Sequence, residues 1–183
     1  EHFVLPWPGE FFVLNALLAI ECGKSLNIPA KKLSNYLHTI SPLQRALNKS
    51  VHKTQKYTIF QDLYSANKAG VLSAIKHLGK SKGRKIFISQ PLIELGSDAK
   101  NTHKEIFNTL KVIDAEVYWL KEDFTEIGKQ ILEDNFFFLN PRQKKSLNVL
   151  QILQETLDPE DSVLIEGKIP KEIRNIFRNK KVC

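Results

Sequence analysis

The sequence predicts an α/β protein with a Rossmann-like, mostly parallel sheet, helices on both faces and a short helical segment ahead of it. From residue 56 onward, short segments rich in β-branched and aromatic residues alternate strictly with longer amphipathic ones, as in βαβ units. Residues 86–88 and 136–138 are continuous apolar runs, which are typical of central strands buried on both faces.

The first 55 residues have a different pattern. Residues 11–20 form an apolar run rich in Ala and Leu, which predicts a buried helix that ends at Gly23. Pro29 begins a second helix, and the Ser-Pro pair at residues 41–42 ends it. Residues 43–55 are polar and basic, so we expect a linker or a domain edge there.

The remaining elements follow in regular alternation. We expect strands at residues 57–60, 85–89, 116–120, 136–139 and 162–165. We expect helices at residues 68–78, 101–110, 124–132, 142–157 and 171–178. These spacings suit crossovers between parallel strands.

Composition limits the classes of function. The formal net charge of +7 favours acidic partners such as nucleotides or phosphorylated substrates. The basic stretches 80–85 and 178–181 lack interleaved aromatic residues, so we expect solvated surface there and no nucleic-acid partner. The sequence contains no run of about 18 apolar residues, so we expect no membrane span. Two cysteines make no disulfide framework, which fits a reducing compartment such as the cytoplasm. The chain contains no Met and begins at Glu1, so we expect a piece of a longer product or a processed chain.

Residues 61–67 hold the first candidate site. Asp62 follows a predicted strand and Asn67 precedes a predicted helix. Helix amino termini attract anions, and an Asp at a strand's carboxyl end can accept from a ribose hydroxyl. The alternative is that Asn67, or Ser65 before it, only caps the helix.

The histidines give little indication of a ligand-binding, metal or catalytic site. His103 starts a helix after the second strand of the alternation, at the sheet edge where α/β folds bind ligands, although a surface or capping role is the alternative. No pair of histidines has metal-ligand spacing, so we expect no metal site. No nucleophile–base arrangement is present, so we expect no catalytic residue within this chain.

Three segments, in order and at suitable separations, carry a family resemblance. They are PGEFFVLNALLA at residues 8–19, QDLYSAN at residues 61–67, and GRKIFI at residues 83–88 followed by ELG at 94–96 and by His103. Together they resemble the Mur ligase family of ATP-dependent peptidoglycan enzymes. Within that family the likeness is greatest to the ligases that add D-alanyl-D-alanine to a UDP-muramoyl tripeptide.

The resemblance implies a domain organisation and a function. Residues 1–51 would be the end of the central ATPase domain, and residues 52–183 the carboxyl-terminal Rossmann-like domain. This part would help to close on ATP and to position the incoming amino acid or dipeptide, and it would not turn over alone. The full-length cytoplasmic enzyme would act on UDP-muramoyl-peptide and D-alanyl-D-alanine-like substrates. The P-loop lysine and the Mg²⁺ ligands would lie mainly outside this chain.

The resemblance also implies roles for single residues. The residues that would bind ATP are Asn15 at adenine, Arg45 at the phosphates, Asp62 near the ribose, and Asn67 in the loop. The candidates on the loop or substrate side are Tyr64, His103 and Lys168.

Departures from the family pattern keep a second interpretation open. Phe11 and Phe12 occupy the positions of a family His and Asn, and Gln61, Ser65 and Lys68 replace polar or proline residues of the family loop. Residues 166–168, Glu-Gly-Lys, replace a Lys-Gly-Ser-like turn. The chain can therefore also be a non-catalytic nucleotide- or partner-binding module derived from the same fold. A stand-alone Rossmann binder is a third option, and it leaves the first 50 residues unexplained.

Overall fold

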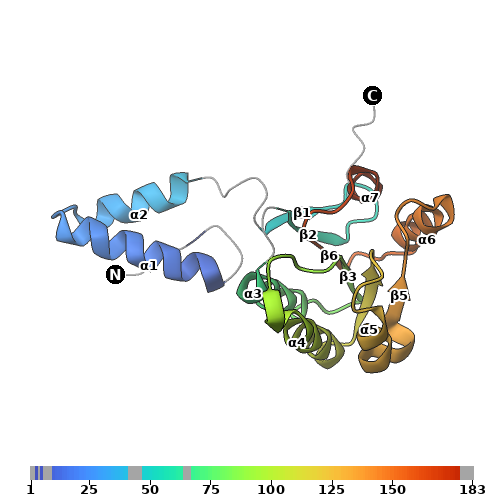
Figure 1. The fold of residues 1–183 in the computed structure, drawn as a ribbon. Helices are drawn as coiled ribbons and strands as arrows, with labels where there is room; N and C mark the ends of the chain where they lie inside the picture. The colour runs from blue at the N-terminus through green and yellow to red at the C-terminus, as the bar shows by residue number, and fades with distance from the viewer. Residues whose placement is uncertain (1–2, 4, 6–9, 41–46, 64–66, 178–183) are drawn as a thin grey trace.

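The computed structural model describes residues 3, 5, 10–40, 47–63 and 67–177 of the chain. A six-stranded sheet lies at its centre, with the order β1-β2-β6-β3-β4-β5 (Figure 1). The strands are β1 (Asn48–Val51), β2 (Thr58–Asp62), β3 (Lys85–Ser89), β4 (Ala115–Trp119), β5 (Phe136–Phe138) and β6 (Ser162–Glu166). β1 pairs antiparallel with β2, and all the other neighbouring pairs are parallel. The predicted α/β class with a mostly parallel sheet is confirmed.

Helices cover both faces of the sheet. One face packs against α3 (Lys68–Leu78), α4 (Ala99–Val112) and α5 (Thr125–Leu132), and the other against α6 (Lys144–Glu155) and α7 (Lys171–Ile176). Two short 3-10 helices, Gly96–Asp98 and Glu133–Asn135, lie before α4 and after α5. Within β3, Phe87 points into the first core while Ile86 and Ile88 point into the second. This burial on both faces explains the continuous apolar run of that strand.

The run of phenylalanines at residues 136–138 belongs to an edge strand, so the expectation of a central strand is wrong. β5 is the last strand in the sheet order and pairs with β4. Phe136 is buried in the core, whereas Phe137 is 38% exposed and stacks on Tyr118 with 4.9 Å between ring centroids. An apolar run alone therefore does not distinguish a covered edge from the centre of a sheet.

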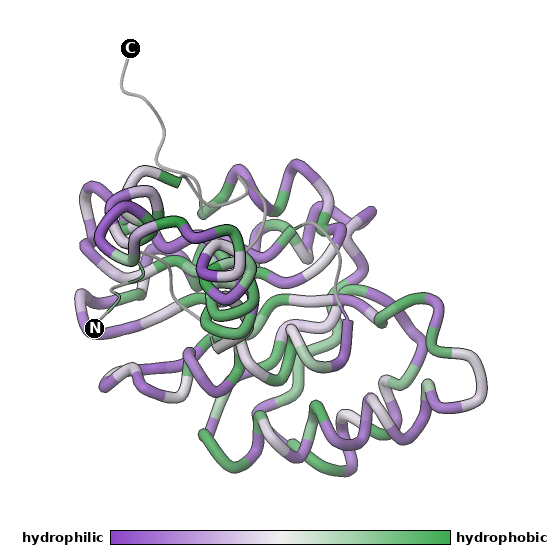
Figure 2. The backbone as a smooth tube through the Cα atoms, turned by 90° about the vertical axis from the view of Figure 1, so that its left-hand side faces the viewer, coloured by the Kyte–Doolittle hydropathy of each residue, from purple (hydrophilic) through white to green (hydrophobic). Residues whose placement is uncertain are grey.

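The first two helices form a hairpin beside the sheet, α1 (Glu10–Ser25) and α2 (Ala30–Thr39) (Figure 1). The apolar run was expected to be buried, but Val13, Leu14, Leu17 and Leu18 are exposed, with Leu18 at 68%. Figure 2 looks onto this side of the molecule and shows apolar turns of the hairpin in green. Among the described residues, a small cluster centred on Ala16, Ile20 and Leu37 is buried between the two helices.

Gly23 lies inside α1 and does not end it, contrary to expectation. A Cβ atom at this position would lie 2.6 Å from Cδ2 of Leu33 in α2. The glycine therefore permits the close approach of the two helices, a packing role that outweighs its weak helix propensity.

β1 lies within residues 43–55, where the sequence suggests a linker or a domain edge. Its residues are exposed or half-buried, and the strand is held by antiparallel pairing, with Lys49 opposite Phe60. Backbone pairing at a sheet edge requires no apolar pattern, which is why the strand leaves no signal in the sequence. The division of the chain at residue 52 stays a prediction. Among the described residues, no helix is long and apolar enough to cross a membrane.

Candidate functional site

The carboxyl ends of β2 and β6 meet at one point of the sheet edge. Asp62 is the last residue of β2 and lies beside Glu166, the last residue of β6. The backbone N–H of Gly167 donates to the carbonyl of Asp62 at 2.7 Å, which fixes the turn that follows β6. Ligands of open α/β sheets bind at this edge, so the structure puts Asp62 where the sequence predicts it.

Glu166 is a buried carboxyl group that the sequence analysis did not select. Its side chain is 1% exposed, and Oε2 has no hydrogen-bond partner in the part of the chain that the structure describes. Burial, and then the nearby charge of Asp62, raises the pKa of Glu166 well above its usual value. The protonated form is therefore favoured, and the edge carries two adjacent carboxyl groups that do not both ionise readily.

Asn67 caps α3, which confirms the capping interpretation. Its Oδ1 accepts from the backbone N–H of Gly70 at 2.8 Å, and Asn67 has the extended backbone typical of an N-cap. The oxygen of this amide is therefore used by the hydrogen bond that caps the helix. A contact between Asn67 and ATP stays a prediction. Arg45 and Tyr64 lie outside the described residues.

His103 is buried and is not a surface or capping residue, and its role on the loop or substrate side stays a prediction. Its Nε2 accepts from the backbone N–H of Leu92 at 3.1 Å, and Nδ1 lies 2.6 Å from the carbonyl of Ala99. The ring stacks on Phe124 with 3.9 Å between centroids, and burial lowers its pKa. Both ring nitrogens are engaged by the chain's own backbone, so the imidazole ties the loop after β3 to α4.

The two other candidates lie apart from each other. Asn15 is exposed on α1, in the hairpin. Lys168 is exposed just after β6, beside a hollow of about 180 Å³ that Leu63 and Arg174 also line. The pairing of β2 with β6 therefore brings Asp62 and Lys168 to the same region of the sheet edge.

A larger hollow of about 650 Å³ opens along the same edge, beyond the ends of β3, β4 and β5. Gln90 and Leu120, which directly follow β3 and β4, line it together with Asn140, two residues beyond the end of β5. It also carries charges of both signs, from Lys121, Glu122, Asp123, Arg142 and Glu172. Its place at the carboxyl ends of parallel strands could have been anticipated from the topology, but the individual residues lie in loops without a motif.

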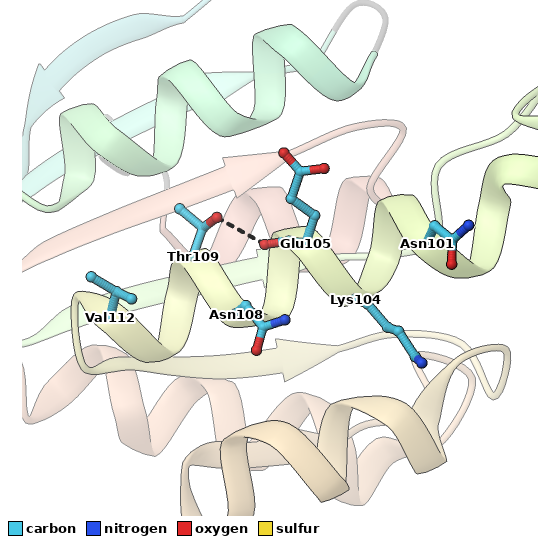
Figure 3. A pocket seen from close by; sticks show the side chains of 6 residues that line it. All are labelled: Asn101, Lys104, Glu105, Asn108, Thr109 and Val112. Atoms are coloured by element: carbon cyan, nitrogen blue, oxygen red, sulfur yellow. Dashed lines mark hydrogen bonds between the residues drawn. The ribbon is translucent and has the colours of Figure 1, made fainter.

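A third hollow, of about 470 Å³, follows the outer side of α4 (Figure 3). Its lining residues all belong to that one helix, and Val112 at its end is exposed. The side chains in Figure 3 spread along the helix and do not converge on a common point. This surface therefore lacks the concave, convergent arrangement of a ligand site.

The chain is similar in sequence to known ligases. No family model matches the chain. A UDP-N-acetylmuramoyl-tripeptide–D-alanyl-D-alanine ligase of Buchnera aphidicola subsp. Baizongia pistaciae is 34% identical over 60% of this chain and 24% of its own length. The ligase of the same name from Buchnera aphidicola subsp. Acyrthosiphon pisum is 26% identical over 98% of the chain and 40% of its own length.

The fold of the chain is also similar to that of a solved ligase. MurF ligase from Thermotoga maritima, solved in complex with ADP, superposes with a TM-score of 0.74 at 18% identity, over 93% of this chain and 38% of that one. The chain thus spans less than half of the length of each of these proteins. The resemblance to the Mur ligase family that the sequence indicates is confirmed, and the chain corresponds to the carboxyl-terminal part of these ligases.

Proposed function

We propose that this chain is the carboxyl-terminal part of an ATP-dependent Mur-type ligase of peptidoglycan precursor synthesis. The observation that carries the proposal is similarity to D-alanyl-D-alanine ligases of this family through 98% of the chain. The named substrates of those relatives, a UDP-muramoyl tripeptide and D-alanyl-D-alanine, are extended to this protein. Residues 1–51 and 52–183 then belong to two domains of a cytoplasmic enzyme. A non-catalytic module is not favoured, because the relatives are ligases.

The described residues suit the nucleoside end of ATP better than its phosphates. The Asp62 carboxylate can accept from ribose hydroxyls, and the exposed amide of Asn15 can both donate to and accept from adenine. The negative charge of Asp62 disfavours a phosphate there. ATP supplies the phosphoryl group that activates a substrate carboxylate for attack by an amine. We assign the phosphates to Arg45 and to residues outside this chain.

Magnesium is assigned to residues outside the chain as well. Within the described part, no group of three or more His, Cys, Asp or Glu side chains is arranged to hold a metal ion. Mg²⁺ usually binds through one or two carboxylates together with substrate phosphates. The P-loop and the metal ligands of a Mur-type ligase would therefore come from the preceding part of the central domain.

The hollow of about 650 Å³ suits the incoming dipeptide. A dipeptide is zwitterionic, and this hollow offers cations for the carboxylate, with Arg142 able to bind it through two parallel hydrogen bonds. Glu122, Asp123 and Glu172 offer carboxylates for the ammonium group. Charges of both signs in one hollow fit such a ligand better than a nucleotide.

Steady-state ligation by the full-length protein tests this assignment. Arg142→Gln should raise KM for D-alanyl-D-alanine by about 10-fold or more, the equivalent of one charged hydrogen bond, and leave KM for ATP unchanged. Lys145→Gln removes the same charge from an exposed position of α6 and serves as the control. An equal effect of both variants, or none of Arg142→Gln, would remove the hollow from the substrate site.

The nucleotide assignment has a separate test. Asp62→Ala and Arg45→Ala should each weaken binding of a non-hydrolysable ATP analogue to the full-length protein by about 10-fold, measured by calorimetry. Unchanged binding in both variants would contradict the catalytic interpretation and favour a module with a lost nucleotide site. The isolated 183-residue chain should not hydrolyse ATP or form a peptide bond. Turnover by that chain would refute the assignment as one part of a ligase.

A further inference from the structure

A basic hollow of about 260 Å³ lies at the amino-terminal side of the sheet, away from the edge that holds Asp62. Lys49 of β1, His77 near the end of α3, and Lys80 and Lys82 of the following turn all line it. They come from two distant parts of the sequence and converge because Lys49 of β1 pairs opposite Phe60 of β2, on the face of the sheet that α3 covers. Residues 80–82 of the basic stretch 80–85, which was expected to be solvated surface, are thus part of a concave surface.

The cations of this hollow lack acidic partners. Within the described part of the chain, Lys49, Lys80 and Lys82 take part in none of the ion pairs, and Glu160 is the one acidic side chain among the lining residues. Three ammonium groups and an imidazole therefore face one carboxylate. Uncompensated positive charge in a concave surface raises the local concentration of anions.

The positive charge of the hollow affects the pKa of His77. Its ring packs edge-on against Phe60 with 4.9 Å between centroids, which holds the imidazole at the wall of the hollow. Burial lowers the pKa of His77, and the charges of Lys80 and Lys49 lower it further. Lys80 and Lys49 are thus both close enough to the ring to act on it electrostatically.

Hydroxyl groups complete the lining. Thr58 and Ser162 are the first residues of β2 and β6, and Ser81 in the turn donates from Oγ to Oγ of Ser162 at 2.8 Å. A hydrogen bond holds the turn in place, because the buried carboxylate of Asp161 accepts from the backbone N–H of Arg84 at 2.7 Å. Ammonium and hydroxyl donors on a rigid frame are the groups that bind phosphate oxygens.

We propose that this hollow is a second binding site, for a small anion of the phosphate or diphosphate class. The unpaired cations, the hydroxyl donors and the fixed turn support this ligand. The volume lies below the roughly 300–1,000 Å³ of sites for drug-sized molecules, which favours a small anion over a whole nucleotide. The site lies at the opposite end of the strands from the proposed nucleotide cleft. Binding of an anion there therefore does not depend on ligase activity.

Nuclear magnetic resonance of the full-length protein tests the site with inorganic pyrophosphate as the probe, at constant ionic strength. We expect saturable shifts of the His77 ring resonances and a rise in the pKa of His77 when the anion is bound. The double variant Lys49→Gln/Lys80→Gln should weaken binding by about 10-fold or more. It should also raise the pKa of His77 without ligand, because two positive charges beside the ring are removed.

The control is Lys144→Gln/Lys145→Gln, which removes the same charge from exposed positions of α6 on the other face of the sheet. Binding that survives in the control and fails in the Lys49→Gln/Lys80→Gln variant supports the site. Equal weakening in both variants would mean unspecific attraction to net charge, and absence of saturation would mean no site. Tight binding of a short oligonucleotide through the same lysines, without binding of pyrophosphate, would replace the proposal with a nucleic-acid surface.

Discussion

Replacing Glu166 tests most directly whether burial and the neighbouring Asp62 raise the pKa of its carboxyl group. The carboxyl group is buried, its Oε2 has no partner in the described part of the chain, and Asp62 lies beside it. Both burial and the charge of Asp62 raise its pKa. We expect Glu166→Gln to stabilise the protein at neutral pH, because a carboxamide has nearly the same shape and carries no charge to desolvate.

The size of the effect follows from proton linkage. A carboxyl group whose pKa is higher in the folded state holds its proton more tightly there. The stability that this proton contributes is fully present below the pKa of unfolded glutamate, about 4.3, and is lost as the pH rises through the folded pKa. Within that window, one proton changes the free energy of unfolding by about 1.4 kcal/mol per pH unit. The advantage of Glu166→Gln should therefore grow by about 1.4 kcal/mol from about pH 5 to pH 6, or about 3–6 °C in Tm.

Urea unfolding followed by circular dichroism, at several pH values, measures this difference. Glu155→Gln makes the same chemical change at an exposed position of α6 and should alter stability by less than about 0.5 kcal/mol at every pH. A Glu166→Gln protein that keeps the pH slope of the parent would refute the reasoning. It would mean that Glu166 is ionised in the folded protein and has an acceptor role that glutamine cannot take.

Substitutions at three further positions probe the elements that hold the site. Gly128→Ala should lower the free energy of unfolding by about 1–3 kcal/mol in urea titrations, because a Cβ atom there would overlap the ring of Phe136. Asn67→Ala should lower it by about 1 kcal/mol through loss of the cap on α3, and Asn67→Asp should restore most of it. Because burial lowers the pKa of His103, the stability that its neutral ring contributes should be present above about pH 6.5 and lost as the pH falls through the folded value. His103→Gln should flatten this acid-side slope in the same titrations.

The sheet domain was predictable because its signals are local. α3 and β3 begin and end at the expected residues, since Asn67 caps the helix and the strand is buried on both faces. The other expected helices and strands of this domain were also found, with ends shifted by a few residues. Such boundaries depend on caps and last-turn hydrogen bonds that the sequence pattern specifies weakly.

The helical hairpin shows where local signals fail. The apolar run of α1 predicts a helix correctly, but whether that helix is buried depends on what packs against it. Here α2 covers one side, and Leu14 and Leu18 remain exposed on another. Gly23 was misinterpreted for the same reason, because the approach of Leu33 is a tertiary contact. Under the proposed function, the exposed leucines would face the remainder of the central domain.

The sequence could predict a site residue only where that residue lies at the end of a predicted strand. Asp62 could be selected because it lies at the carboxyl end of β2, and ligand contacts concentrate at such positions. Glu166 could not, because its importance depends on the strand order. β6 is inserted between β2 and β3, although it is the last strand of the chain. Only this non-local pairing puts Glu166 beside Asp62 and out of contact with solvent.

This pairing decides which part of a ligand the edge can accept. The family resemblance puts a lysine-containing turn where this chain has Glu166, so a positive charge is replaced by a buried acid. A neutral Glu166 leaves Asp62 as the charged group of the pair, which suits hydroxyl or ammonium donors and opposes phosphate. Neutralisation of the nucleotide phosphates must then come from cations elsewhere in the protein. Under the proposed function, closing of the domains is what would bring those cations to the ribose held at Asp62.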